Sequence, residues 1–263
     1  MKKIFFNILV VLLFTSCISL LGGCAHYKAY LKEQQTVTVR NYPFAYFDSL
    51  VISGRMYVEI KQGGFAVSSA AQKQFNDQIN AKVQGSTLYI TLPGYVPQQS
   101  VAVLINLPDL KSLKASNNAY ITAPSLKVKT LNITADSHAS ISIQGQIGLN
   151  QVTQKSDGKI DVSWVKSKNL EINSNDNGRV TLAGRVLQLI AKLSGKAQVD
   201  TRYLRAQHAD IFATRAATAH VWAAKSLKAY ADEQSNIYYY RYPLRKTIVS
   251  REHGNVLYME GIR

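Results

Sequence analysis

The sequence predicts an all-β protein: a single-domain parallel β-solenoid (β-helix) with rungs of about 20 residues, preceded by a lipoprotein signal peptide. Three observations support this prediction. A short motif recurs at a near-constant interval, strand-like runs alternate apolar and polar residues between its copies, and the N-terminal leader ends in a cysteine. We divide the chain into a leader at 1–23, a lipidated tether at 24–36 and a solenoid at 37–263, with regular rungs at 108–263.

The recurring motif is a small residue, then any residue, then Ile or Val. Successive β-branched anchors are 20, 19, 20, 19, 22, 16 and 19 residues apart. Such an interval is typical of solenoids, in which each repeat forms one coil and buries its apolar face against its neighbours. The eight copies are Ala119-Tyr120-Ile121, Ala139-Ser140-Ile141, Gly158-Lys159-Ile160, Gly178-Arg179-Val180, Ala197-Gln198-Val199, Ala219-His220-Val221, Ser235-Asn236-Ile237 and Gly254-Asn255-Val256.

Each copy also has the same local context. A polar run such as Asn175-Asp176-Asn177 precedes the small residue, and such residues favour turns. An alternating run such as Ile141-Ser142-Ile143 follows, with the period of a half-buried strand. The small residue suits a tight inward corner, where a larger side chain would collide with adjacent rungs. A β-sandwich or propeller with chance regularity is the alternative interpretation.

The region before the regular rungs carries strand-like runs without the motif, such as Leu50-Val51-Ile52. We expect it to form irregular first coils that cap the open end of the solenoid, because uncapped sheet edges invite aggregation. One or two helical turns are expected around residues 69–79. Residues 238–243 break the pattern before the last rung and are expected to form a protruding loop.

The leader has the features of a lipoprotein export signal. Lys2 and Lys3 precede an apolar stretch at 4–21, and Leu21-Gly22-Gly23-Cys24 resembles the bacterial lipobox. This resemblance implies cleavage between Gly23 and Cys24, and lipidation of Cys24, which would anchor the chain in a membrane. An uncleaved transmembrane anchor is the alternative, although the stretch is barely long enough to span.

The leader also bears on localisation in the cell envelope. Ala25 follows the cysteine where an aspartate often signals inner-membrane retention, which favours the outer membrane and leaves open whether the solenoid is periplasmic or on the surface. Cys24 is the one cysteine left after cleavage, so no intramolecular disulfide is expected.

The formal charge is +15, and removal of Lys2 and Lys3 with the leader leaves +13. A basic envelope protein attracts polyanions, so an anionic glycan or envelope polymer is a candidate partner. Solubility alone is the alternative explanation. Lys and Arg are spread along the sequence, most densely at 166–168 and 241–251, and no nucleic-acid-binding motif is present.

Catalytic chemistry has weak support. Lys159 and Arg179 precede neighbouring anchors, and Asp161 and Asp200 follow anchors two rungs apart, so the four form a conceivable surface patch. Solvated surface charge is the favoured explanation. The five histidines lack metal-ligand spacing, and neither a catalytic centre, a metal nor a cofactor is predicted.

The aromatic residues near the C-terminal end allow two interpretations. Trp222, Tyr230 and the run Tyr238–Tyr240 could offer a surface for stacking sugars, or they could close an apolar core. We favour the core.

Four segments resemble the head GIN domain family of auto-transporter adhesins over about residues 44–263. They are Phe47–Gly54, Val58–Gly63, Gly85–Ile90 and Gly254–Gly261. The resemblance implies an exported, often lipid-anchored, single-domain β-solenoid with no established enzymatic activity. We expect the chain to differ from a true autotransporter, because the repeat runs to Arg263 and no translocator is expected to follow it.

Three functions follow as hypotheses. The first is a lipid-anchored, non-enzymatic solenoid that acts as an adhesin or envelope interaction module. The second is a polysaccharide lyase or hydrolase that uses the surface patch. The third is a structural or stress-related periplasmic lipoprotein that binds a protein partner.

Overall fold

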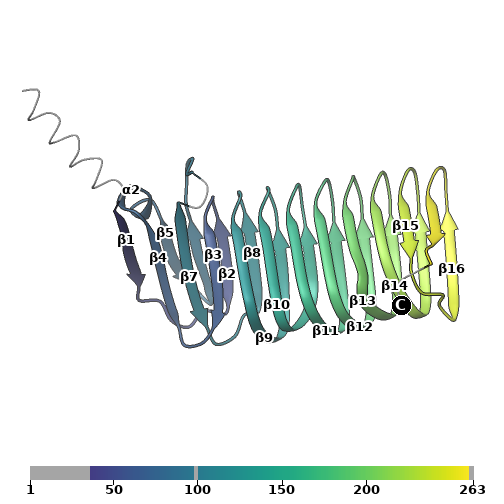
Figure 1. Ribbon diagram of the computed structural model, residues 1–263, viewed down its shortest axis with the longest axis horizontal. Coiled ribbons are helices and arrows are strands. Elements are labelled where there is room, and N and C mark those ends of the chain that lie inside the picture. The colour runs from purple at the N-terminus through teal and green to yellow at the C-terminus, as the bar shows by residue number, and fades with distance from the viewer. Residues whose placement is uncertain (1–35, 98–99, 261–263) are drawn as a thin grey trace, which may run out of the picture.

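The computed structural model describes residues 36–97 and 100–260 and shows a parallel β-solenoid, as the repeat predicts. Figure 1 shows the rungs side by side along one long axis, from β1 at one end to β16 at the other. A sandwich or a propeller is therefore excluded. The predicted signal peptide, Gly23, Cys24 and nearly all of the predicted tether lie outside the described residues.

Six regular rungs each consist of one long strand that bends around the solenoid, and each pairs in parallel with the next. They are β9 (Tyr120–Ala135), β10 (Ser140–Gln154), β11 (Lys159–Ser174), β12 (Arg179–Leu193), β13 (Gln198–Ala213) and β14 (Thr218–Ala231). The last coils are built from β15 (Asn236–Tyr239), β16 (Arg245–Ser250) and β17 (Asn255–Tyr258). The expected break lies between β15 and β16, although Tyr238 and Tyr239 still belong to β15.

The core consists of apolar columns that run along the solenoid. Ile121, Ile141 and Ile160 are in register on successive rungs, and none of them is exposed to solvent. Leu113, Ile133 and Val152 are likewise in register and belong to a second buried column. Each fully buried aliphatic side chain contributes roughly 1.5–3 kcal/mol, so stacking supplies the burial that one rung cannot achieve by itself.

The small-residue column lies at the inward corner, as predicted. At the turn before β10, the Ala139 N–H donates to the carbonyl oxygen of Asp136 at 3.0 Å, and Ser137 has a φ of 49°. The corner is tight: a Cβ on Gly158 would lie 2.7 Å from the carbonyl oxygen of Ala135, closer than real contacts allow. Polar turn residues and small corner residues therefore act together at each turn.

The structure corrects the sixth copy of the motif, whose anchor lies two residues earlier than the pattern predicts. Ala219, not Val221, pairs with the anchor Val199, and Ile237 pairs with Ala219. Side chains alternate with a period of two, so a two-residue slip keeps the same face inward, and the sequence pattern alone does not reveal it. The irregular steps of 22 and 16 residues become 20 and 18. His220, not Trp222, therefore follows the sixth anchor.

The first coils are not stacked in the order of the sequence. β2 pairs in parallel with both β6 and β8, and β3 pairs with both β7 and β9. The first rung of the chain, β2–β3, is thus enclosed between two later ones. The strands are β1 (Val37–Tyr42), β2 (Ser49–Ser53), β3 (Tyr57–Gln62), β4 (Ala66–Gln72), β5 (Asn80–Gln84), β6 (Thr87–Thr91), β7 (Val101–Leu107) and β8 (Ser112–Ser116).

Antiparallel strands finish this end of the solenoid. β4 pairs with β7 and β1 with β4, and β5 pairs with β6. The expected helical turn is α2 (Lys73–Asn76), where the buried Asn76 accepts a bond from Ser69 Oγ at 2.5 Å and donates to the Thr38 carbonyl at 3.0 Å. This polar network ties α2 to β4 and β1, so the irregular coils cap this end, as predicted.

Candidate functional site

The most developed surface features lie along one long face, which we call the ladder face. It presents the residues one position before and one position after each anchor, because these side chains point outward when the anchor points inward. The first column is Tyr57, Tyr120, Ser140, Lys159, Arg179, Gln198, Thr218 and Asn236; the second is Glu59, Thr122, Ser142, Asp161, Thr181, Asp200, His220 and Tyr238.

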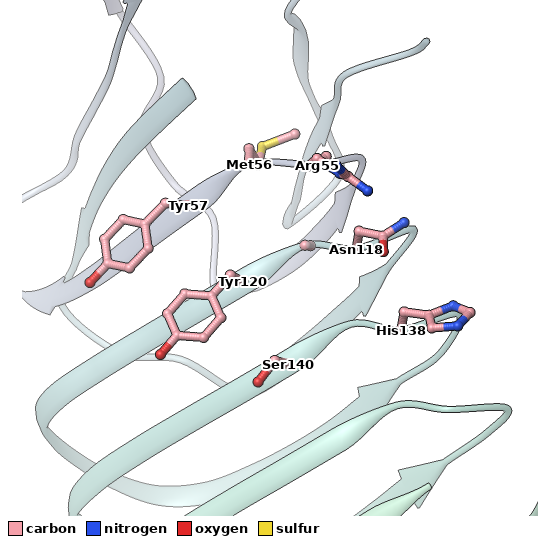
Figure 2. Close-up of a pocket in the computed structure, with 8 residues that line it drawn as sticks. Arg55, Met56, Tyr57, Asn118, Tyr120, His138 and Ser140 are labelled. Atoms are coloured by element: carbon pink, nitrogen blue, oxygen red, sulfur yellow. The ribbon is translucent and has the colours of Figure 1, made fainter. Parts of the chain in front are cut away.

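At its N-terminal end the ladder face carries two stacked tyrosines. The rings of Tyr57 and Tyr120 lie 5.4 Å apart between centroids with an interplanar angle of 22°, and they are 37% and 47% exposed. Figure 2 shows the two rings side by side on neighbouring rungs. The Tyr57 hydroxyl is 3.0 Å from Thr122 Oγ1, which fixes the ring on the sheet. We call this pair the tyrosine shelf.

Polar side chains surround the tyrosine shelf. The shelf lines a concavity of about 610 Å³ together with Arg55, Asn118 and His138 and with Ser140. Figure 2 shows Arg55, Asn118 and His138 along the turn side of this concavity. Flat apolar ring faces beside a few hydrogen-bonding groups are the usual composition of a small-ligand site. The arrangement suits a sugar ring, whose apolar face can lie on tyrosine while its hydroxyls meet the polar groups.

The sequence pattern did not predict this site. Tyr57 lies outside the regular repeat, and only the return of the chain along β8 and β9 places it beside Tyr120. The alternation of Val58 and Ile60 with polar residues indicated an outward Tyr57, but it gave no information about its neighbour.

The four residues of the predicted patch occupy the middle of the ladder face. Lys159 and Arg179 pair across β11 and β12, and Asp161 and Asp200 share a column with Thr181 between them. Two rung spacings put these carboxylates about 10 Å apart. Two of the four make hydrogen bonds to neighbouring side chains. Arg179 Nη2 donates to Gln198 Oε1 at 2.7 Å, and Asp200 accepts from two nitrogens of Arg202.

The surroundings of Asp200 lower the pKa of its carboxyl group. Burial acts to raise the pKa of Asp200, but the hydrogen bonds and charge of Arg202 outweigh it and hold the pKa below its ordinary value. Asp200 is therefore ionised at neutral pH and cannot serve as a general acid there. The patch as a functional site remains a prediction.

His220 joins this column once the sixth rung is correctly aligned. Its ring stacks on Tyr238 with a centroid distance of 5.0 Å, and its Nδ1 lies 2.7 Å from the Tyr240 hydroxyl. Burial is the largest cause that lowers the pKa of His220; Arg202 also lowers it, while Asp200 raises it. His220 is thus a neutral, stacked side chain near neutral pH.

The aromatic residues near the C-terminal end correct one expectation. Only Tyr239 of the set enters the core, with 4% of its surface exposed. Trp222, Tyr230, Tyr238 and Tyr240 are half-buried on the outside, because each directly follows an inward residue in the sequence. The favoured core interpretation is therefore wrong for these four.

Between 36 and 97 and between 100 and 260, no group of three or more His, Cys, Asp or Glu side chains could hold a metal ion. None of the helices in this part of the chain is both long and apolar enough to cross a membrane.

The fold and the ladder face define a class: parallel β-solenoids with long, open faces of stacked side chains. The chain belongs to the family described as "putative auto-transporter adhesin, head GIN domain", whose model matches residues 46–243. The resemblance noted in the sequence is thereby confirmed. The adhesin description suggests a non-enzymatic, exported or envelope-associated protein.

Solved structures share the fold. An adhesin-titled protein from Parabacteroides merdae is 17% identical with a TM-score of 0.73, covering 86% of this chain and 97% of that one. A protein from Parabacteroides distasonis, titled as lipid binding, is 17% identical with a TM-score of 0.72 and covers 85% and 97%. An adhesin-titled Bacteroides fragilis protein is 15% identical with a TM-score of 0.63, at the same coverage. No curated protein matches this chain.

Proposed function

We propose that this chain is an exported lipoprotein, anchored to the outer membrane through Cys24, whose solenoid is a non-enzymatic adhesin or envelope interaction module. The observation that carries the proposal is the family match over residues 46–243, which spans most of the solenoid. The lipobox-like Leu21-Gly22-Gly23-Cys24 supports the anchor. Two or three acyl chains hold a protein on a membrane much more firmly than one.

The tyrosine shelf supports glycan recognition by this module. Stacking between Tyr57 and Tyr120 and the bond to Thr122 hold the shelf in place before any ligand arrives. Preorganisation reduces the entropy cost of binding. A rigid stack of rungs therefore suits repeated contact with a cell-surface or envelope glycan.

The polysaccharide-active alternative has less support. A glycosidase of the common type needs a carboxylic acid that can donate a proton and a second carboxylate roughly 5–10 Å from it. Arg202 holds Asp200 ionised, so Asp200 cannot donate that proton. We therefore propose binding without turnover.

The anchor and the location are tested together in cells. In the wild type, labelled palmitate should be incorporated and the chain should fractionate with the outer membrane, and Cys24→Ala should abolish both. A non-palmitoylated chain that is soluble in both strains would refute the anchor.

Protease treatment of intact cells then distinguishes the two membrane faces. Digestion of the solenoid while a periplasmic control stays intact would identify a surface adhesin. Protection until the envelope is opened would identify a periplasmic interaction module and direct the search to envelope partners.

A further inference from the structure

One side of the solenoid is free of acidic residues. It lies between the ladder face and the wall that contains Leu131 and Leu170, and we call it the basic side. Its segments hold ten Lys or Arg residues and no Asp or Glu, within a chain that has sixteen acidic residues. The segments on successive rungs are 124–130, 144–148, 163–169, 183–188, 202–208, 222–226 and 240–245.

The fold assembles this concentration of charge from a sequence in which the cations are spread out. Lys166 pairs in register with Arg185, and Arg185 with Arg205, so three cations lie one rung spacing of about 4.8 Å apart. Lys225 joins them in lining a shallow groove of about 460 Å³ that crosses β11, β12, β13 and β14. All four side chains are exposed.

The nearest carboxylates do not neutralise this groove. Asp200 is bonded to Arg202, and Glu171 pairs with Lys192 at 3.4 Å on the neighbouring wall. Among the described residues, no ion pair joins a carboxylate to Lys166, Arg185, Arg205 or Lys225. Four like charges held this close repel one another, and a polyanion would relieve the repulsion.

Aromatic residues lie in the segments of the basic side. Trp164 is 74% exposed and has a φ of 68°, a left-handed conformation that is rare for a bulky residue. Tyr203 is 62% exposed. On β12, which lies between the rungs of Trp164 and Tyr203, the residue in register with Tyr203 is the small Ala183. Trp222 lies in the groove with the Arg241 guanidinium 5.7 Å from its ring. Strained residues of this kind often occur where a ligand is held.

We propose that the basic side binds a linear anionic polysaccharide that lies along the solenoid axis. Its carboxylate or sulfate groups would meet the cation ladder, and its sugar rings would stack on Trp164 and Tyr203. A straight ladder with regular spacing suits an extended polymer better than a compact anion. The inference deepens the proposed function, because it names the class of ligand and a second surface apart from the tyrosine shelf.

The chain supplies its own reporter for this site. Both of its tryptophans, Trp164 and Trp222, lie on the basic side. Intrinsic tryptophan fluorescence of the full lipidated protein in detergent should therefore change on titration with heparin or polygalacturonate and stay constant with neutral dextran. Trp222→Phe should retain the response through Trp164.

Matched charge variants test the location. Lys166→Gln, Arg185→Gln and Arg205→Gln combined should weaken heparin binding at least tenfold. The negative slope of log affinity against log salt should become shallower by about 2, because fewer counterions are released on binding when cation contacts are lost. The control replaces three exposed lysines away from the basic side, Lys114→Gln, Lys155→Gln and Lys196→Gln, with the same loss of net charge and little change in affinity.

Three results would overturn the proposal. Equal weakening in both triple variants would mean that only net charge matters. Tighter binding to single-stranded DNA or to anionic vesicles, which heparin fails to displace, would assign the surface to nucleic acid or lipid instead. A lack of heparin binding by a folded wild type would remove the ligand class while leaving the membrane anchor intact. Palmitate labelling is scored independently, so its failure refutes the proposed function and not the binding surface.

Discussion

The corner occupied by Gly178 offers a sharp test of how the rungs fit together. A Cβ at this position would overlap the side-chain amide of Gln154 on the preceding rung. Other copies of the same corner hold alanine, as at Ala139 and Ala197, and the φ of Gly178 is not positive. Gly178 is therefore required because of Gln154 and not because of its backbone conformation.

Gln154 cannot move without cost. Its side chain is completely buried, its Nε2 donates to the Ser156 carbonyl at 2.9 Å, and its Oε1 accepts from Ser174 Oγ at 2.5 Å. A buried polar group that loses its partner costs about 1–3 kcal/mol, and overpacking costs a similar amount. We expect Gly178→Ala to lower the free energy of unfolding by about 2–4 kcal/mol.

A double-mutant cycle isolates the cause. Gln154→Ala removes the obstacle and destabilises the protein by itself, because it leaves Ser174 unpaired. In that background Gly178→Ala should cost less than about 0.5 kcal/mol, or stabilise slightly through reduced freedom of the unfolded chain. The two substitutions should thus be coupled by about 2 kcal/mol or more, measured from urea unfolding with comparable m-values.

Two outcomes would contradict this explanation of Gly178. If Gly178→Ala is equally costly with and without Gln154, the corner needs glycine for backbone reasons. If it is harmless in both backgrounds, the small-residue column does not limit the packing of the rungs.

Two further predictions concern the ladder face. Replacing Tyr57 and Tyr120 with Ala should weaken the binding of any glycan found for the tyrosine shelf at least tenfold in a titration. The control Tyr46→Ala removes another exposed tyrosine and should leave the affinity unchanged. Equal loss of affinity in both variants would exclude the tyrosine shelf as the binding site. Because the folded pKa of His220 is lowered, the unfolded state binds the proton more readily, so stability should fall as the pH decreases through 6.5 toward the folded pKa. The pH dependence of the urea midpoint should be shallower in that window for His220→Gln, and an unchanged slope would contradict the lowered pKa.

The repeat was readable from the sequence because its chemistry is local. Polar turns, a small corner residue and a β-branched anchor recur within a few positions, so a periodic pattern predicts the solenoid without a structure. The same locality explains the slip at the sixth copy. Ala217, Ala219 and Val221 are all buried on one face, and only the pairing of Ala219 with Val199 selects the correct register.

The binding surfaces, in contrast, are properties of the stack. Tyr57 and Tyr120 are 63 positions apart in the chain, and they stack because β3 pairs with β9. Lys166, Arg185 and Arg205 are separated by about one repeat each, so they look dispersed in sequence and become neighbours only when the rungs are in register.

The sequence by itself determined the fold class and the length of the rung, and it predicts a lipoprotein leader, because each of these depends on residues close together in the chain. The tertiary structure decided the order of the first coils, the exact register and the grouping of aromatic and basic side chains. Those features depend on which strands pair, and in a solenoid a shift of two residues changes the neighbours of every outward side chain without changing which residues are buried.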